Sequence, residues 1–317
     1  MPEGAKTVIL NSGEYFELQK NAKYFIENNH QPYFSQKRNG QIIVEAFHGY
    51  PYKLMGSANY TDNLGVTQAR INSFQQRERE WDYLISPAPY ATPLYAKYFD
   101  FHGTFIEEGY PRNDIFFDKQ EVEKISQKVK ERLNIASDKI VVLYAPTHRE
   151  NNAIDEFRSK RADFVNYHEL AKELGDQYVL LIRAHAMTQR TGDRVATTAQ
   201  VIDVTDYPDI NDLIIVSDLA VLDYSSLRFD YAQTKKPMIF LIPDIEEYEA
   251  QRPGLYPYTP TAPGPWVNNL EELRNAIINI ETLEKKYTKK YQTFIEEFTP
   301  LEDGNSATRV INKIFNN

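Results

Sequence analysis

Polar side chains that can bind phosphate follow two short apolar runs of this sequence. The run 219–222 leads into Asp223-Tyr224-Ser225-Ser226, and the run 178–182 leads into Arg183-Ala184-His185. Serine hydroxyls and the unpaired backbone N–H groups at the start of a helix bind anions. Open α/β sheets bind their ligands beyond the carboxyl ends of the strands, so both groups can reach one site. The pattern predicts a site for a phosphate or a diphosphate.

The elements that must position these residues are alternating strands and helices. Strands are predicted at 140–144, 178–183, 201–204, 219–222 and 238–242, and helices at 164–174, 209–217 and 227–234. Such alternation is typical of a parallel sheet joined by right-handed crossovers. Thr147 and Arg149 follow the first of these strands and can add a hydroxyl and a fixed charge.

The first third of the chain gives a sparser pattern. It offers strands at 41–47, 83–86 and 104–108 after one helical region at 14–28. A Rossmann-like domain needs more strands than these, so we expect an incomplete first domain. Near the end of the chain, helices are expected at 270–280, 282–298 and 306–315, the last of them capped by Asn305 or Ser306.

The composition excludes several classes of function. The 317 residues carry a net charge of −9, whereas sequence-independent binding of nucleic acid needs a basic surface. Cysteine is absent, which removes disulfides and thiolate catalysis. The first residues lack the apolar core of a signal peptide, and no apolar run approaches the ~20 residues of a membrane span. We expect a soluble, cytoplasmic protein, with peripheral attachment to the inner face of the cell membrane left open.

Further short motifs are spread over most of the chain. They are His48–Lys53, Gly109–Asp114, Tyr144–Arg149, Ser217-Asp218, Lys236-Pro237, Pro263–Pro265 and Asp303–Ser306. Together with the two phosphate-binding groups, and in this order, they resemble the CDP-glycerol glycerophosphotransferases, the teichoic acid and capsule polymerase family. The resemblance extends from residue 22 to the end of the chain.

Two departures from the family pattern are visible. Ala186 stands where the family often has proline after the histidine matched by His185. The family's N-terminal domain normally begins well upstream of the segment matched by 23–49. We therefore expect the chain to hold the tail of that domain and the whole of the second one.

The resemblance implies a GT-B-like α/β fold, in which two Rossmann-like domains face each other across a cleft. We place an acceptor-side domain at 1–113, a nucleotide-donor domain at 114–298, and a C-terminal segment that crosses back to the first domain at 299–317. The diphosphate of the donor is expected at the carboxyl ends of the strands of the second domain.

The chemistry that the resemblance implies is transfer of a polyol phosphate. An acceptor hydroxyl attacks the phosphorus that bears the glycerol, CMP leaves, and a phosphodiester forms. His48 would accept the proton of the hydroxyl, since an imidazole with a pKa of ~6.5 can act as a base near neutrality. His185 and Arg183 would hold the diphosphate and stabilise the leaving CMP.

Other polar residues are expected around the donor and the acceptor. Donor contacts are assigned to Ser225, Ser226, Thr147, Arg149 and Asp223, and acceptor or phosphate contacts to Lys53 and Arg112. Each has a structural alternative, because serines cap helices, an aspartate can orient its turn, and the two cations can pair with carboxylates. No Asp-x-Asp motif suited to a metal is present, so we expect neither a metal nor another cofactor.

Three functions remain open at this point. The leading one is a transferase that moves a polyol phosphate, glycerol phosphate first, from a CDP-activated donor to a hydroxyl of a growing teichoic-acid-like or capsule polymer, which can be lipid-linked. The second is a GT-B glycosyltransferase that uses a CMP- or UDP-sugar. The third is a catalytically silent nucleotide-binding domain. The sequence does not separate CDP-glycerol from CDP-ribitol as the donor.

Overall fold

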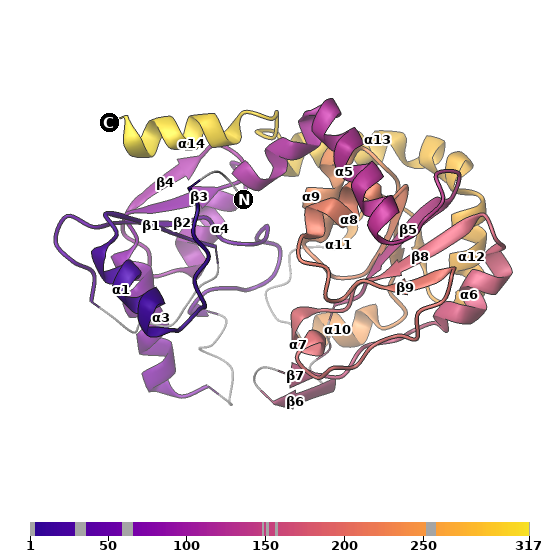
Figure 1. Ribbon diagram of the computed structural model, residues 1–317, viewed down its shortest axis with the longest axis horizontal. Helices are drawn as coiled ribbons and strands as arrows, with labels where there is room; N and C mark the ends of the chain where they lie inside the picture. Colours follow the sequence, from indigo (N-terminus) through magenta and orange to yellow (C-terminus); the bar gives the residue numbers. More distant parts are fainter. Residues whose placement is uncertain are drawn as a thin grey trace. The chain divides into compact units, whose positions relative to one another are not determined.

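The computed structural model describes residues 4–28, 36–58, 66–147, 149, 152–155, 158–251 and 258–316. The chain divides into two units. The first comprises 1–110 and 309–317, and the second comprises 111–308. Each has a parallel sheet with helices, which confirms the α/β class predicted from the sequence (Figure 1).

A four-stranded parallel sheet forms the first unit, with its strands in chain order. The strands are β1 (Tyr24–Glu27), β2 (Ile42–Glu45), β3 (Tyr83–Ser86) and β4 (Thr104–Glu107), and the helices are α1 (Gly13–Asn21), α3 (Gln68–Glu80) and α4 (Ala91–Tyr98). The core of this unit is rich in aromatic side chains, among them the buried Trp81, Tyr95 and Phe99. Large rings compensate for the small area that four-residue strands can bury.

The sequence prediction of one helical region at 14–28 is wrong in its second half. Helix α1 ends at Asn21, the next residue is extended, and β1 follows. Tyr24 and Phe25 of β1 pair with the isoleucines at the start of β2, so aromatic residues occupy sheet positions here. Pairing with a distant strand overrides the local helical pattern, and the unit has four strands instead of three.

Six parallel strands form the sheet of the second unit, in the order β12-β11-β10-β5-β8-β9. They are β5 (Ile140–Ala145), β8 (Tyr178–Ile182), β9 (Val201–Asp203), β10 (Leu219–Leu222), β11 (Met238–Leu241) and β12 (Trp266–Val267). The five strands predicted in this part of the chain are confirmed to within one residue at each end. All of them pair in parallel, as predicted.

The second unit also contains most of the helices. They are α5 (Lys119–Arg132), α6 (Tyr167–Leu174), α7 (Ala186–Gln189), α8 (Ile210–Val216), α9 (Leu227–Tyr231), α10 (Ile245–Gln251), α11 (Tyr258–Thr261), α12 (Leu270–Ile278) and α13 (Ile280–Phe298). Two 3-10 helices, η1 (Pro111–Phe117) and η3 (Ala232–Thr234), and a hairpin of β6 (Ala153–Asp155) and β7 (Arg158–Ser159) accompany them. Helix α6 starts later than predicted because the Asn166 side chain caps its first N–H groups.

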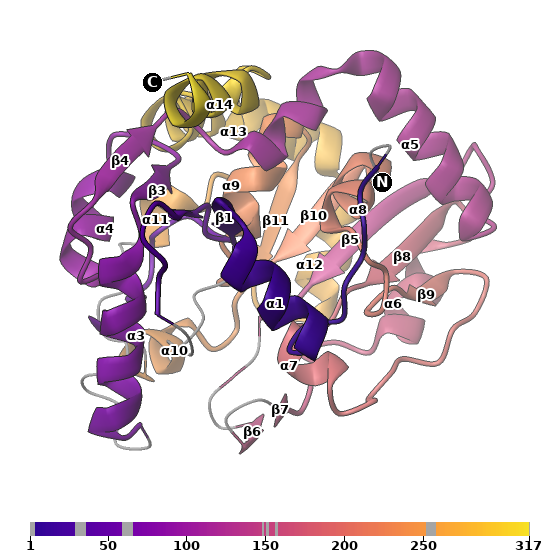
Figure 2. The ribbon, with the colours of Figure 1, turned by 60° about the vertical axis from the view of Figure 1, so that its left-hand side comes forward.

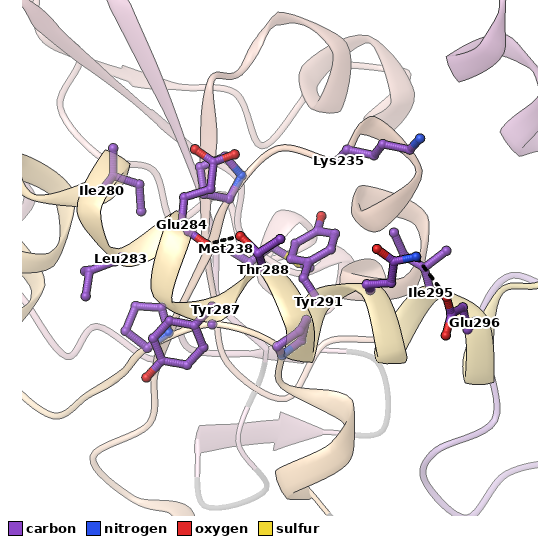
Figure 3. Close-up of a pocket in the computed structure, with 15 residues that line it drawn as sticks. Lys235, Met238, Ile280, Leu283, Glu284, Tyr287, Thr288, Tyr291, Ile295 and Glu296 are labelled. Carbon is purple, nitrogen blue, oxygen red and sulfur yellow. Dashed lines mark hydrogen bonds between the residues drawn. The ribbon is translucent and has the colours of Figure 1, made fainter.

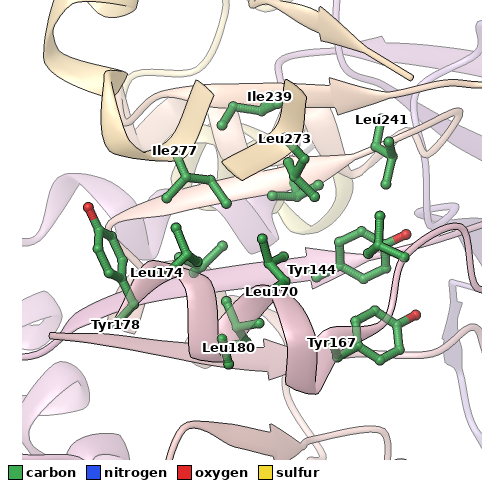
Figure 4. Packing of buried hydrophobic residues seen from close by; sticks show 14 of the residues in the cluster. Tyr144, Tyr167, Leu170, Leu174, Tyr178, Leu180, Ile239, Leu241, Leu273 and Ile277 are labelled. Atoms are coloured by element: carbon green, nitrogen blue, oxygen red, sulfur yellow. The ribbon is translucent and has the colours of Figure 1, made fainter. Parts of the chain in front are cut away.

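The core of the second unit lies between its sheet and the helices α6 and α12 (Figure 4). Val142 of β5 and Leu180 of β8 point into this core, and Leu170 of α6 and Leu273 of α12 pack against them. Helices α5 and α8 pack against each other, and α8 also contacts β5 (Figure 2). Because helices cover both faces of a parallel sheet, its strands are apolar throughout, and this is why the sequence shows continuous apolar runs.

Helix α14 (Ser306–Phe315) begins in the second unit, and its residues from 309 on belong to the first. The backbone N–H groups of Ser306 and Ala307 donate to the carboxylate of Asp114 at 3.0 and 2.7 Å. A side chain from η1 therefore caps this helix, where the sequence suggested a cap from the preceding residues.

Helix α13 combines length with charge. Its 19 residues include four lysines and four glutamates. Within the described part of the chain, no helix is both long enough and apolar enough to cross a membrane.

Candidate functional site

The sheet of the second unit reverses its strand order between β5 and β10. From β5 the chain adds β8 and β9 on one side, and then returns to add β10, β11 and β12 on the other. Open α/β sheets bind ligands outside the carboxyl ends of the strands at such a reversal. The residues that follow β5 and β10 are therefore the candidate site of this unit.

Asp223 is the centre of this candidate site. It follows β10 directly, and its buried carboxylate accepts from the Thr147 backbone N–H at 2.9 and 3.0 Å and from the Thr147 hydroxyl at 2.6 Å. The Arg149 guanidinium pairs with the same carboxylate at 2.9 Å. The structure thus brings together three of the predicted donor contacts, but they bind one another and form a buried frame at the strand ends.

Arg149 lies between two carboxylates and a stacked pair of tyrosines. Its Nε donates to Asp244 at 2.6 Å, opposite the contact with Asp223. The rings of Tyr224 and Tyr248 stack 3.7 Å apart, and the guanidinium lies 4.8 and 5.1 Å from their centroids. Burial lowers the pKa of a guanidinium, but the two carboxylates outweigh it, so the pKa of Arg149 is raised. A permanent positive charge is therefore fixed at the strand reversal.

Ser225 and Ser226 precede α9, as the sequence predicted, and their hydroxyls differ in role. The Ser225 hydroxyl accepts from the Leu227 backbone N–H at 3.2 Å, so it caps the helix. Ser226 occupies the N-cap position with helical backbone angles, and its side chain makes no capping hydrogen bond. Both serines are half-buried. Of the two, Ser226 is the better candidate for contact with a ligand.

Arg228, which no sequence motif indicated, fixes the loop that carries these serines. Its fully buried guanidinium donates to the carbonyl oxygens of Asp223, Ser225 and Thr261. Arginine suits this role because its N–H donors form a rigid fork. Asp244, which holds Arg149, was missed too. The sequence signal that identified the other residues, a polar residue after an apolar strand, also applies to Asp244, which follows the apolar run of β11.

Arg183 follows β8 as predicted, but backbone carbonyl groups engage its guanidinium. Its Nη1 donates to the carbonyl oxygens of Val204 and Thr205 at 2.8 Å each, and also to that of Tyr207. Burial lowers the pKa of Arg183. Arg183 therefore fixes the turn between β9 and α8, and its contact with a diphosphate stays a prediction.

His185 caps the short helix α7, which begins at Ala186. Its Nδ1 accepts the backbone N–H of Met187 at 3.3 Å, and the side chain is half-buried. A ring nitrogen that accepts a hydrogen bond carries no proton, so the proton of the neutral imidazole is on Nε2. The imidazole of His185 can therefore donate from Nε2 to an anion.

His48 of the first unit follows β2 and is exposed. Its Nδ1 lies 3.0 Å from the carbonyl oxygen of Asn28. A carbonyl group only accepts, so Nδ1 carries the proton and Nε2 is the basic nitrogen of the neutral imidazole. The carbonyl oxygen of Gly49 accepts from the hydroxyls of Tyr95 and Tyr110 at 2.9 and 3.0 Å. These contacts fix the turn that presents a basic nitrogen beyond the carboxyl end of β2.

The two cations predicted to contact acceptor or phosphate are both half-buried. Arg112, at the start of η1, pairs with the buried carboxylate of Asp230 at 3.0 Å, which is the structural alternative expected for it. The Nζ of Lys53 lies 5.2 Å from the ring centroid of Tyr52, within cation–π range. A phosphate contact by either residue stays a prediction. His148, inside one of the sequence motifs, lies outside the described residues.

The carboxylates of the candidate site are occupied by a cation of the protein. Asp223 and Asp244 both pair with Arg149. In the residue ranges that the structure describes, no three histidine, aspartate or glutamate side chains gather so as to hold a metal ion. Catalysis without a metal or another cofactor stays a prediction.

A cavity of about 290 Å³ lies at the amino ends of β11 and β12 in the same sheet (Figure 3). Its lining includes Met238, which begins β11, Pro265, which precedes β12, and Tyr287 and Tyr291 of α13. It contains none of the site residues predicted from the sequence. The cavity is therefore separate from the strand reversal.

Comparison with known proteins identifies relatives over nearly the whole chain. The family described as CDP-Glycerol:Poly(glycerophosphate) glycerophosphotransferase matches residues 1–316. The teichoic acid poly(glycerol phosphate) polymerase of Bacillus subtilis is 36% identical over 297 residues, which cover 93% of this chain and 40% of that protein. The teichoic acid glycerol-phosphate transferase of Staphylococcus aureus is 34% identical over 308 residues, which cover 96% of this chain and 79% of that protein. The chain thus spans less than half the length of the Bacillus relative.

Solved structures of a wall teichoic acid polymerase, TagF, resemble the chain closely. One has a TM-score of 0.87 at 29% identity and covers 100% of this chain and 78% of that chain. A TagF variant soaked with CDPG has the same TM-score of 0.87. The GT-B-like fold class that the sequence motifs implied is thereby confirmed. The chain belongs to the CDP-glycerol:poly(glycerophosphate) glycerophosphotransferase family.

Proposed function

We propose that the chain transfers glycerol phosphate from CDP-glycerol to a hydroxyl group of a growing teichoic-acid-like polymer. The acceptor oxygen forms a bond to the phosphorus that bears the glycerol, and the bond from that phosphorus to the CMP oxygen breaks. The proton of the hydroxyl passes to a base, and CMP leaves with the electron pair of the broken bond. Family membership and the names of the relatives support this reaction class.

The observation that carries the proposal is the opposite proton placement on two histidines. His48 donates from Nδ1 to the carbonyl oxygen of Asn28, so its Nε2 can take a proton. His185 accepts at Nδ1 from the backbone of Met187, so its Nε2–H can donate. A base for the hydroxyl and a donor for a phosphate oxygen are the two groups that this transfer needs. We assign the first role to His48 and the second to His185.

The second unit is the proposed binding unit for the donor. Ser226 and the ends of β5 and β10 lie at the strand reversal, and this supports the assignment because α/β sheets bind nucleotides at such positions. Arg149 and Arg183 add positive charge near these strand ends, although their guanidinium groups are already engaged by protein atoms. Their role toward a diphosphate is then electrostatic, because a buried charge acts over several ångströms in a low dielectric. The soak of TagF with CDPG fits such a donor.

Glycerol is the proposed polyol. The relatives named for glycerol phosphate are 36% and 34% identical to this chain, whereas a ribitol-phosphate polymerase of Staphylococcus aureus is 27% identical. Parallel assays with CDP-glycerol and CDP-ribitol test this choice. Faster release of CMP from CDP-ribitol would reverse it.

Release of CMP from CDP-glycerol in the presence of a poly(glycerol phosphate) acceptor tests the proposed reaction. His48→Ala is expected to lower the rate by ~10²–10⁴-fold while donor affinity is retained, because only the base is lost. His185→Ala is expected to lose both donor binding and turnover. His102→Ala is the matched control, since His102 is an exposed histidine that pairs with Asp100. Full activity of His48→Ala would remove the assignment of the base.

The same assay separates the alternative functions. A silent nucleotide-binding domain would bind CMP and release none from CDP-glycerol. A glycosyltransferase would turn over a CMP- or UDP-sugar in place of CDP-glycerol. Calorimetry with CMP tests the serine assignment, because Ser226→Ala should weaken binding about tenfold, the effect of one charge-assisted hydrogen bond. Unchanged affinity would leave both serines as parts of the helix start.

We further propose that the acceptor is lipid-linked and that the chain meets it at a membrane surface. Ile9, Leu10 and Leu18 of the first unit are exposed apolar residues near α1, at 80%, 60% and 48% exposure. Exposed apolar side chains of this kind favour contact with a membrane interface. Flotation with anionic lipid vesicles should recover the wild-type chain and much less of an Ile9→Ser, Leu10→Ser variant. Equal recovery would argue against this contact.

A further inference from the structure

Glu45, the last residue of β2, is a completely buried acid directly before the turn that carries His48. It lies in register with Glu27, the last residue of the neighbouring strand β1. Residues in register on parallel strands point to the same face of the sheet, so the two carboxyl groups are neighbours. Two acids side by side in a core call for an explanation, because burial disfavours charge.

The two carboxyl groups have very different partners. Glu27 accepts from Arg77 at 3.0 and 2.8 Å and from the indole N–H of Trp81 at 2.7 Å. Glu45 accepts a single bond at Oε1, from the backbone N–H of Phe47 at 2.6 Å. Its buried Oε2 has no hydrogen-bond partner among the described residues. Glu27 therefore has the environment of a carboxylate, and Glu45 has that of a neutral acid.

The charges around Glu45 agree with this division. Burial, and next the negative charge of Glu27, raise the pKa of Glu45 well above its usual value. The Phe47 N–H and the positive charge of Arg77 on α3 oppose this shift and are outweighed. Glu80 of α3 adds a second negative charge beside Arg77, which it contacts at 3.3 Å. The raised pKa of Glu45 and its unpartnered, buried Oε2 both favour the protonated form of this acid.

Glu45 acts on His48 through the backbone of Phe47. Phe47 has a φ of +52°, a left-handed conformation that is costly for a bulky residue. The hydrogen bond from its N–H to Glu45 holds this conformation, and the Phe47 ring packs against the His48 ring with centroids 4.3 Å apart. On the other side, Asn28 directly follows Glu27 and accepts from His48. Glu45 therefore supports the residue that packs against the imidazole, and Glu27 directly precedes the residue that accepts its hydrogen bond.

We propose that Glu45 is a positioning residue that, as a neutral carboxylic acid, holds the Phe47 turn so that Nδ1 of His48 faces Asn28 and Nε2 faces the substrate. This role deepens the proposed function and rests on it. Glu45 itself touches no substrate. A neutral acid suits the position because a second charge beside Glu27 would repel it and loosen the ends of β1 and β2.

Two substitutions separate positioning from bulk packing. Glu45→Gln keeps the shape of the side chain and an oxygen for the Phe47 N–H, and cannot ionise. Glu45→Leu keeps a similar volume and removes the acceptor. The nitrogen chemical shifts of the His48 ring, measured by NMR, report its tautomer without any substrate. The exposed His102 serves as the internal reference in the same spectra.

We expect Glu45→Gln to keep the Nδ1–H tautomer of His48 and a turnover within about threefold of wild type. Glu45→Leu should lose the tautomer preference and about 10–100-fold in turnover, the effect of a misplaced catalytic group, with donor affinity unchanged. As the pH is raised, the wild-type His48 signature should also change when Glu45 ionises, whereas that of Glu45→Gln should not. This comparison of wild type and Glu45→Gln over pH tests the proposal even if Glu45→Leu does not fold.

Two outcomes would overturn the proposal. One is an unchanged His48 tautomer in Glu45→Leu. The other is a loss in Glu45→Gln as large as in Glu45→Leu, since the acid would then act by its own proton. A wild-type chain that releases no CMP would refute the proposed transfer, but the NMR arm would still decide whether Glu45 orients His48.

Discussion

Replacing Asp223 with alanine removes the acceptor around which the strand reversal of the second unit is built. The carboxylate accepts from the Thr147 backbone, the Thr147 hydroxyl, the Tyr224 backbone and Arg149. All these contacts are buried, so water cannot replace the lost acceptor. The variant is therefore expected to lose much more stability than an average surface substitution.

The size of the loss can be worked out from these contacts. Removing one partner of a buried ion pair costs about 3–5 kcal/mol. Arg149 keeps its second partner, Asp244, which reduces this term. The backbone N–H groups of Thr147 and Tyr224 lose their acceptor, at about 1–3 kcal/mol for each buried unsatisfied group. Because the terms overlap, we expect Asp223→Ala to lower the free energy of unfolding by about 3–5 kcal/mol.

Urea unfolding followed by circular dichroism measures this loss. Asp223→Asn keeps one oxygen acceptor and should lose about 1.5–3 kcal/mol, close to the worth of hydrogen bonds to a charged group. Asp206→Asn is the matched control, because Asp206 is exposed and pairs with Arg194 at the surface. We expect the control to unfold at the wild-type urea concentration. If Asp223→Ala unfolds at the same urea concentration as the control, the buried frame does not stabilise the strand reversal.

Two further predictions concern a buried acid and a glycine. Burial raises the pKa of Glu78 to about 7, although the Ser57 N–H and hydroxyl bind its carboxylate. The folded chain then binds this proton more tightly than the unfolded chain. The free energy of unfolding of the wild type, relative to that of Glu78→Gln, should therefore fall by about 2.5 kcal/mol between about pH 5 and about pH 8. Urea unfolding of both chains at each pH measures this difference, and an equal pH dependence of the two chains would contradict it. A Cβ at Gly264 would lie 1.9 Å from the carbonyl oxygen of Met238, so Gly264→Ala should cost about 1–3 kcal/mol. Gly13→Ala, at the open start of α1, should cost nothing measurable, and equal melting temperatures of the two variants would refute the steric argument.

Local sequence pattern was enough to predict the sheet of the second unit. Each of its strands but the shortest is an apolar run that stops at polar residues, because both faces of a parallel sheet are covered by helices. The same stops identified Thr147, Asp223 and His185 as residues at strand ends. In the first unit the pattern was misleading for β1, because only Ala22 and Lys23 separate this strand from the end of α1. Its pairing with β2 decides that this segment is a strand.

What these side chains do at the strand ends was decided by the tertiary structure. The sequence contains Asp223, Arg149 and Asp244 far apart, and only the reversal of strand order brings them into one ion-paired frame.

The proton placement on the two histidines is also a tertiary property. His48 is oriented by a carbonyl oxygen from the end of β1, a strand that the sequence pattern did not reveal. Residue type and order along the chain determined the family and the chemical groups that are available. The partners of each group depend on sheet register and strand order, and these arise from packing between distant segments, which no local pattern encodes.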